Sequence, residues 1–156
     1  MTPACRVSVR QDLRPAPIPG RRLKAYARAA LALLSANGAD VRVRVVGDAA
    51  IRRWNREFLG RDRPTNVLSF PEAAGVPARG ARVAGDIVVS APTCLSETGG
   101  WKEAPEARVF FFVLHGILHL AGYDHEGGGA PARRMRRKEL AIYRRVLDEE
   151  GRGRPR

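Results

Sequence analysis

Alternating apolar and polar residues mark four short strands along the chain. Residues 5–9 alternate and predict a first strand, and residues 41–46 (VRVRVV) alternate valine with arginine, the pattern of a strand with one buried face. Residues 65–70 (TNVLSF) predict a short third strand. Residues 83–90 are almost entirely apolar, which is typical of a central strand buried on both faces.

Between and after these strands, apolar residues recur at helical spacing. We expect helices over residues 21–35, from an N-cap at Asp48 to about residue 58, over 92–98, over 103–121 and over 132–150. The pattern predicts an α+β fold: one domain over residues 1–150, with an about four-stranded mixed sheet packed with about five helices. Residues 151–156 (GRGRPR) are expected to form a basic, disordered tail.

Length and composition are those of an ordinary folded domain. The chain has 156 residues, of which 44% are hydrophobic and 28% charged. Its two cysteines exclude a disulfide framework and a four-cysteine zinc site, and they favour a reducing compartment. No apolar stretch is long enough to span a membrane, and no secretory signal is recognisable. We therefore expect a cytoplasmic protein with no membrane partner.

The charge balance favours a polyanionic partner. The formal net charge is +12, and nearly all the basic residues are arginine. Such an excess favours nucleic acid, although an arginine-rich composition alone can produce it. A basic cluster in the last helix is either a phosphate-facing stripe or a solvated face; it comprises Arg133, Arg134, Arg136, Arg137 and Lys138. Aromatic residues are few, and we assign residues 110–112 to the core, so phosphate contacts are expected to dominate over base stacking.

All three histidines of the chain lie in one segment, HGILHLAGYDH at residues 115–125. His115 and His119 are four residues apart on the predicted helix and therefore share a face. Gly122 can end the helix and turn the chain back, so that His125 supplies a third ligand. Three imidazoles and one open position are typical of a catalytic Zn²⁺ site, and we expect one such ion.

The spacing matches the zinc signature of the metzincin proteases, with one change, and predicts a metzincin-like metal helix. Gly116 occupies the position at which those proteases carry their catalytic glutamate. A closed structural zinc site would need a fourth protein ligand, and neither Cys5 nor Cys94 is near the histidines in the sequence. A vacant coordination position favours catalysis over a structural role.

Three motifs occur in one order: PTNVLSFP (64–71), AGDIVVS (84–90) and HGILHLAGYDH (115–125). Together they resemble the YbeY family of bacterial endoribonucleases over roughly residues 40–145. The resemblance implies a single-metal hydrolase that acts on ribosomal RNA, notably in 3′-end maturation of the small-subunit RNA, and in ribosome quality control. It implies His115, His119 and His125 as metal ligands, and the ribosome or its small subunit as partner.

One departure from the family pattern affects phosphate binding. The family commonly has an arginine just before the glycine that precedes the first motif, and this chain has Leu59 there. Arg61 or Arg63 is a candidate to contact phosphate instead. Asp124 is interpreted as a turn residue or an orienter of the neighbouring ligand rather than a base. Asn66 either points into a cleft or makes hydrogen bonds in a turn, and the turn role is preferred.

The expected mechanism is attack of a metal-activated water on a phosphodiester of single-stranded RNA, with His115 in the catalytic centre and Arg61 or Arg63 on the phosphates. Two alternatives remain open at this point. The first is a metalloprotease-like hydrolase, which shares the ligand spacing. The second is a non-catalytic module that binds ribosomal RNA or the ribosome and contains a structural zinc.

Overall fold

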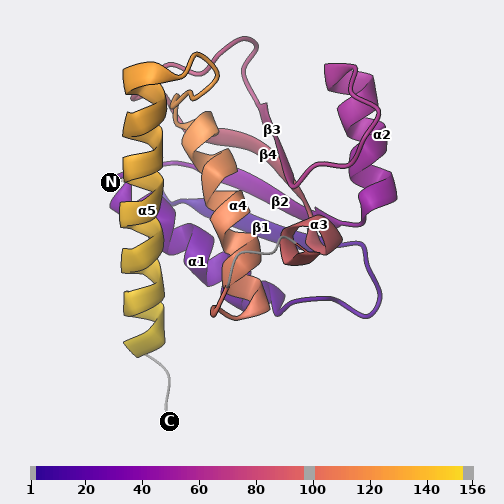
Figure 1. Ribbon diagram of the computed structural model, residues 1–156. Helices are drawn as coiled ribbons and strands as arrows, with labels where there is room; N and C mark the ends of the chain where they lie inside the picture. Colours follow the sequence, from indigo (N-terminus) through magenta and orange to yellow (C-terminus); the bar gives the residue numbers. More distant parts are fainter. Residues whose placement is uncertain (1–2, 97–100, 153–156) are drawn as a thin grey trace.

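The computed structural model describes residues 3–96 and 101–152, which form a four-stranded sheet and five helices (Figure 1). The sheet order is β1 (Arg6–Gln11), β2 (Asp40–Val46), β4 (Ala84–Ser90) and β3 (Val67–Pro71). β1, β2 and β4 are parallel, and β3 pairs with β4 in the antiparallel sense. The predicted α+β fold with a mixed sheet is confirmed, and β4 is indeed an inner strand.

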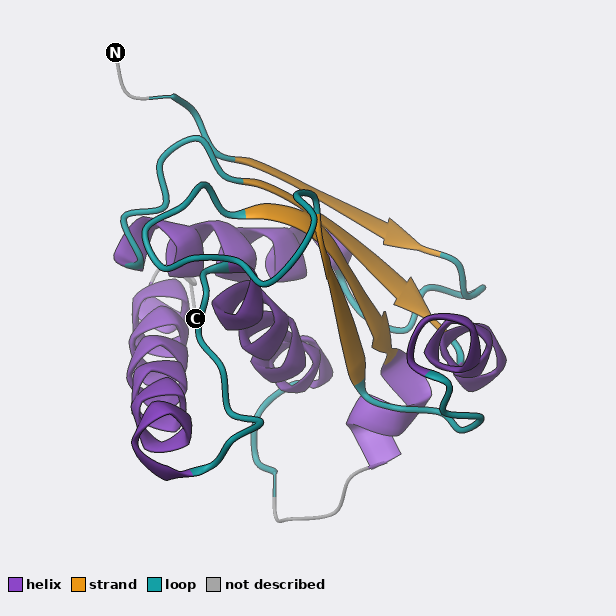
Figure 2. Ribbon diagram, turned by 90° about the horizontal axis from the view of Figure 1, so that it is seen from above, coloured by secondary structure: helices purple, strands orange, loops and turns teal. Residues whose placement is uncertain are grey.

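One face of the sheet is covered by α1 (Gly20–Leu33) and α4 (Pro105–Leu120), and α5 (Gly129–Arg152) packs against these two helices (Figure 2). The valines of β2 explain this arrangement, since Val41, Val43 and Val45 are fully or almost fully buried against the helices. The helix α4 lies between the sheet, α1 and α5 and is apolar on nearly every side, as a central helix must be. The alternating burial of β2 confirms the strand with one buried face that was predicted for residues 41–46.

The opposite face is split between a small apolar cluster and a network of ion pairs. The helix α2 (Asp48–Leu59) covers Val46, Leu68 and Val88 with its own Ile51. The remainder of this face carries the arginines of β2. The Arg42 guanidinium donates to both carboxylate oxygens of Asp86, and further pairs join Arg44 to Asp12 (2.8 Å) and Arg82 to Glu72 (3.0 Å).

The five expected helices are present, and their ends differ from the expected ones by one to three residues. Gly47, not Asp48, is the N-cap of α2, and Asp48 is the first helical residue. The expectation was wrong because the Asp48 carboxylate accepts hydrogen bonds from Ser90 Oγ (2.5 Å) and Thr93 Oγ1 (2.6 Å) instead of capping its own helix. It thereby joins α2 to α3 (Ala91–Ser96). The last helix extends through Arg152, and residues 153–156 of the expected tail lie outside the described residues.

Within residues 3–96 and 101–152, no helix combines the length and the apolar character needed to cross a bilayer.

Replacement of Asp48 by alanine tests this junction. Because Ser90 is fully buried, Asp48→Ala leaves a buried hydroxyl without its acceptor, and we expect a loss of about 2–3 kcal/mol in the free energy of unfolding. Urea denaturation measures the loss. Asp62→Ala is the matched control, because this exposed carboxylate pairs only with exposed arginines and its removal should cost far less. Equal effects of the two substitutions would contradict the assigned role of Asp48.

Candidate metal centre

The three histidines meet at the C-terminal end of α4. His115 and His119 lie one turn apart on the helix, as their spacing predicts. The helix then ends in a Schellman turn, in which the Gly122 N–H donates to His119 O and the Tyr123 N–H donates to Leu118 O. The turn directs the chain back so that His125 faces the other two rings.

Gly122 is required at this turn for two reasons. Its φ is +90°, a value that favours glycine. In addition, a Cβ atom at this position would lie 2.7 Å from the backbone nitrogen of Arg79, in the loop between β3 and β4. The predicted role of Gly122 as the residue that ends the helix is therefore confirmed.

The ligand nitrogens converge on one point. His115 Nε2 lies 3.1 Å from His125 Nε2 and 3.2 Å from His119 Nε2. With zinc–nitrogen bonds of about 2.0–2.1 Å, tetrahedral coordination separates two imidazole nitrogens by about 3.3 Å. The observed separations therefore fit a single ion held by three imidazoles.

The tautomers give a second test of this fit. His119 Nδ1 lies 3.1 Å from Tyr123 O, a carbonyl that can only accept, so Nδ1 carries the proton. His115 Nδ1 lies 3.3 Å from the Glu139 carboxylate and is likewise the donor. Both Nε2 atoms then present lone pairs to each other across 3.2 Å. Two lone pairs at that distance repel unless a cation lies between them.

Burial favours the neutral, ligating form of His119. Desolvation, together with the neighbouring His115 and His125, lowers the pKa of His119 below its ordinary value, and the hydrogen bond to Tyr123 O opposes this only in part. The imidazole is therefore uncharged at neutral pH, the state that a metal ligand needs. Within the described parts of the chain, no further cysteine, aspartate or glutamate joins this group of three ligands.

Glu139 is a functional residue that the sequence motifs did not reveal. It lies on α5, is only 7% exposed, and accepts the hydrogen bond from His115 Nδ1. A carboxylate in this position fixes the ring orientation and increases the basicity of a ligating histidine. One signal was present in the sequence: Glu139 occupies a core position of the helix, four residues after Met135 and three before Ile142.

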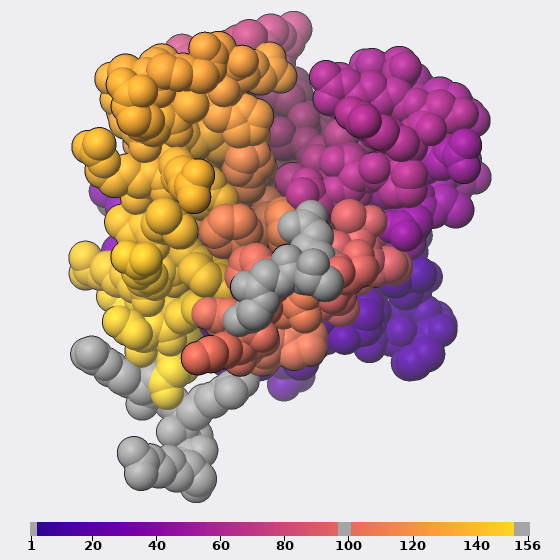
Figure 3. Space-filling view, in the orientation of Figure 1, coloured from indigo at the N-terminus to yellow at the C-terminus, as the bar shows by residue number. Residues whose placement is uncertain are grey.

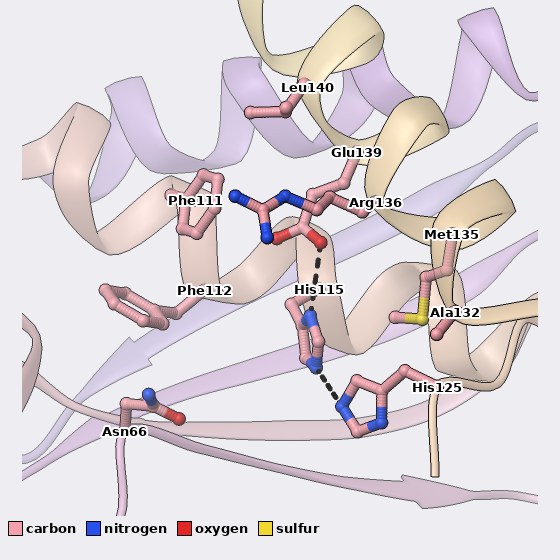
Figure 4. A pocket seen from close by; sticks show the side chains of 10 residues that line it. All are labelled: Asn66, Phe111, Phe112, His115, His125, Ala132, Met135, Arg136, Glu139 and Leu140. Atoms are coloured by element: carbon pink, nitrogen blue, oxygen red, sulfur yellow. Dashed lines mark hydrogen bonds and ion pairs between the residues drawn. The ribbon is translucent and has the colours of Figure 1, made fainter. Parts of the chain in front are cut away.

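A cleft of about 450 Å³ opens beside the metal centre, between α4, α5 and the segment before β3 (Figure 3). His115 and His125 form part of its wall (Figure 4). The other lining residues are Asn66, Phe111, Phe112, Ala132, Met135, Arg136, Glu139 and Leu140. The open side of the histidine cluster therefore faces a space large enough for a bound molecule.

The other candidate residues, Asp124, Arg61 and Arg63, do not line the cleft beside the histidines. Asp124 is exposed and accepts the backbone N–H of Glu126 at 2.9 Å, which lowers the pKa of its carboxyl group. This is the turn role considered from the sequence. Arg61 and Arg63 are exposed in the loop after α2 and do not line the cleft, and Leu59 ends α2 at 54% exposure.

Asn66 lines the cleft, which is the alternative to the turn role, and its carbonyl accepts the N–H of Ser90. One expectation about an individual residue needs correction. Phe110 and Phe112 are core residues as expected, although Phe112 also borders the cleft, whereas Phe111 is only partly buried and forms part of the cleft wall. Sequence reasoning placed all three phenylalanines in the core because it saw only an apolar run in one helix.

Gly116, the position of the protease glutamate, faces the sheet. A Cβ atom on Gly116 would lie 3.0 Å from the side chain of Ile87, which is fully buried on β4. The close approach of α4 to β4 therefore favours glycine here, because a side chain would push against Ile87. A glutamate at this position would place a carboxylate in the apolar core rather than beside the histidines.

Comparison with known proteins identifies close relatives. The family model described as Endoribonuclease YbeY matches residues 14–147. A protein of Geobacter metallireducens named Endoribonuclease YbeY is 41% identical over 148 residues, which cover 94% of this chain and 98% of the relative. A Geobacter sulfurreducens protein of the same name is 43% identical over 129 residues, covering 81% and 86% of the two chains.

A solved structure shows the same fold. The solution structure of a Thermotoga maritima protein matches with a TM-score of 0.65 at 25% sequence identity, covering 92% of this chain and 91% of that protein.

The role of Glu139 can be tested by Glu139→Gln, which keeps the size of the side chain and removes its charge. We expect metal affinity to fall about 10- to 100-fold, because the His115 ring loses its anionic partner. Competition with a metal-binding dye measures the affinity. Glu149→Gln on the exposed side of the same helix is the control and should leave the affinity unchanged. Unchanged affinity in Glu139→Gln would contradict the assigned role.

A second substitution tests the turn. Gly122→Ala forces a side chain into a left-handed conformation and against the backbone of Arg79, so we expect lower thermal stability and weaker metal binding through displacement of His125. Gly127→Ala, in the same loop, meets no atom within 4 Å and serves as control. Calorimetry with and without metal measures both effects; a wild-type metal affinity in Gly122→Ala would show that the turn does not position His125.

Proposed function

This chain belongs to the YbeY family of endoribonucleases, and we propose that it is a metal-dependent endoribonuclease that cleaves single-stranded RNA. The observation that carries the proposal is the convergence of three Nε2 atoms at the wall of a cleft that also contains Arg136. We assign the activity to one domain over residues 1–150. A cytoplasmic location follows from this substrate and stays a prediction.

Zinc is the proposed metal, one ion held by His115, His119 and His125. Three neutral imidazoles with no carboxylate in the ligand group favour zinc over magnesium or calcium, which prefer oxygen ligands. When bound, such an ion supplies a Lewis acid for a phosphoryl oxygen and makes a coordinated water acidic at neutral pH. The vacant side of the site faces the cleft, where a phosphodiester can enter.

The chain's own residues supply orientation and charge. Glu139 and Tyr123 O hold the rings of His115 and His119 so that both Nε2 atoms face the same point. The Asp124 carboxylate accepts a hydrogen bond from the Glu126 N–H and thereby stabilises the turn that positions His125. We propose that Arg61 and Arg63, exposed in the loop after α2, contact phosphates of a strand that extends beyond the cleft.

We propose ribosomal RNA as the physiological substrate, with the ribosome or its small subunit as the partner. The net charge of +12 supports a polyanionic substrate, and an extended RNA offers phosphates to arginines outside the cleft. Maturation of the 3′ end of the small-subunit RNA and a part in ribosome quality control are the processes that the resemblance to the family implies.

The two alternative functions fit the site less well. A protease of the metzincin type would need its general base at residue 116, where the backbone packs against Ile87. A structural zinc would need a fourth ligand, and within the described residues the group that could hold a metal contains only the three histidines. Neither alternative explains a cleft against the open side of the site.

RNA cleavage with and without metal tests the proposal. We expect purified protein to cleave a labelled single-stranded RNA that contains the 3′ end of the small-subunit precursor. A chelator, or His119→Ala, should lower the rate by about a thousandfold or more, since a metal contributes several kcal/mol to such reactions. Added zinc should restore the chelated enzyme and should not restore His119→Ala.

Glu149→Gln is the control variant and should keep the wild-type rate. Casein is offered in parallel as a protein substrate. Cleavage of casein but not RNA would favour the protease function, and RNA cleavage that survives both chelation and His119→Ala would attribute the activity to a contaminating nuclease.

A further inference from the structure

The cleft beside the metal centre extends well beyond the three histidines. We propose that it is a subsite for one unpaired nucleotide, in which the base lies against the aromatic wall of Phe111 and Phe112 while Arg136 binds the adjacent phosphate. This inference rests on the proposed function, which it deepens by naming the part of the RNA that the cleft recognises.

Neighbouring rings hold the Phe111 ring in place. The Phe111 ring contacts three other rings edge-on, with centroid separations of 5.5 Å to Trp101, 5.3 Å to Tyr143 and 5.5 Å to Phe112. Tyr143 is in turn fixed by its hydroxyl, which donates to Ala107 O. Phe111 remains only partly buried and lines the cleft. A preorganised ring of this kind binds a flat base at little entropic cost.

The opposite wall of the cleft comes from α5. Its apolar lining residues are Ala132, Met135 and Leu140, which together with Phe111 and Phe112 make an apolar slot next to His115 (Figure 4). Apolar walls do not contribute to the binding of a phosphate group by itself. The combination of apolar sides with a metal centre at one edge fits a base joined to a phosphate.

Arg136 supplies the charge for that phosphate. Its side chain leaves α5 and places the guanidinium above His115, toward Phe111 (Figure 4). Among the basic residues of the cluster at 133–138, only Arg136 lines the cleft. No carboxylate in residues 3–96 or 101–152 forms an ion pair with it. A guanidinium in this position can bind two phosphate oxygens at once.

The dimensions of the cleft favour an unpaired nucleotide over a duplex. A volume of about 450 Å³ lies in the range of pockets that enclose one small ligand. In a duplex, each base is stacked and paired and cannot present its face to Phe111 unless it leaves the helix, which costs a few kcal/mol. The net charge of +12 and the presence of Arg136 favour RNA over a peptide as the occupant.

The test measures binding rather than cleavage, so that its outcome is separable from the endoribonuclease activity. The probe is a fluorescent single-stranded RNA with phosphorothioate linkages, titrated with zinc-loaded protein and followed by anisotropy. Two matched probes accompany it: the same strand annealed to its complement, and the same backbone with abasic positions. We expect the intact single strand to bind about 5- to 100-fold more tightly than the abasic strand, the range expected for stacking of one base.

Three variants locate the subsite. Arg136→Gln should weaken binding of the single strand about 10-fold or more and lower the salt slope by about one unit. Arg134→Gln makes the same change of charge on the other side of α5 and is the control, for which only a small effect is expected. Ala132→Leu narrows the cleft without touching charge or the buried core, and it should remove most of the preference for the intact strand over the abasic one.

Metal content and thermal unfolding of every variant show whether the site and the fold persist. Equal binding of the intact and abasic strands, or equal losses in Arg136→Gln and Arg134→Gln, would overturn the proposal and leave a general basic surface. Displacement of the RNA probe by an uncharged peptide but not by uridine 5′-monophosphate would also overturn it. Base-dependent binding in a protein that fails to cleave RNA would reject the proposed function and retain the subsite.

Discussion

Three imidazole nitrogens, with His115 Nε2 3.1 Å from His125 Nε2 and 3.2 Å from His119 Nε2, form the constraint on which the metal centre depends. His119 and His115 are each held through Nδ1, by a backbone carbonyl and by Glu139, and therefore cannot turn their nitrogens away from each other. A bound cation would offset the repulsion between these nitrogens and hold them together. Two glycines help to maintain this arrangement. Gly116 allows α4 to lie close to β4, and Gly122 turns the chain back so that His125 completes the group.

The sequence predicted what is encoded by nearby residues. The alternation in residues 41–46 identified a strand with valines on the core side, and the spacing of His115, His119 and Gly122 identified the metal helix and its end. These features depend only on the periodicity of one element. The α+β fold with a mixed four-stranded sheet followed from the order of such elements.

The remainder of the site depends on how distant elements pack, which no local pattern specifies. Glu139 reaches His115 across 24 positions of sequence, and Asn66 joins the cleft from the segment before β3. Asp48 is a residue type that commonly caps helices, yet its carboxylate accepts hydrogen bonds from Ser90 and Thr93, more than 40 residues away. Phe111 has the character of a core residue, and only the position of α5 leaves one side of its ring accessible.

The contribution of Glu139 has a consequence for the timing of activity in a growing chain. All three histidines precede α5 in the sequence, so a growing chain contains them before it contains the helix that carries Glu139. Until that helix docks, His115 has no carboxylate to hold its ring, and one wall of the cleft is missing. The folded geometry of the metal centre therefore forms only after α5, a helix that supplies none of the three ligands, has been synthesised and has docked.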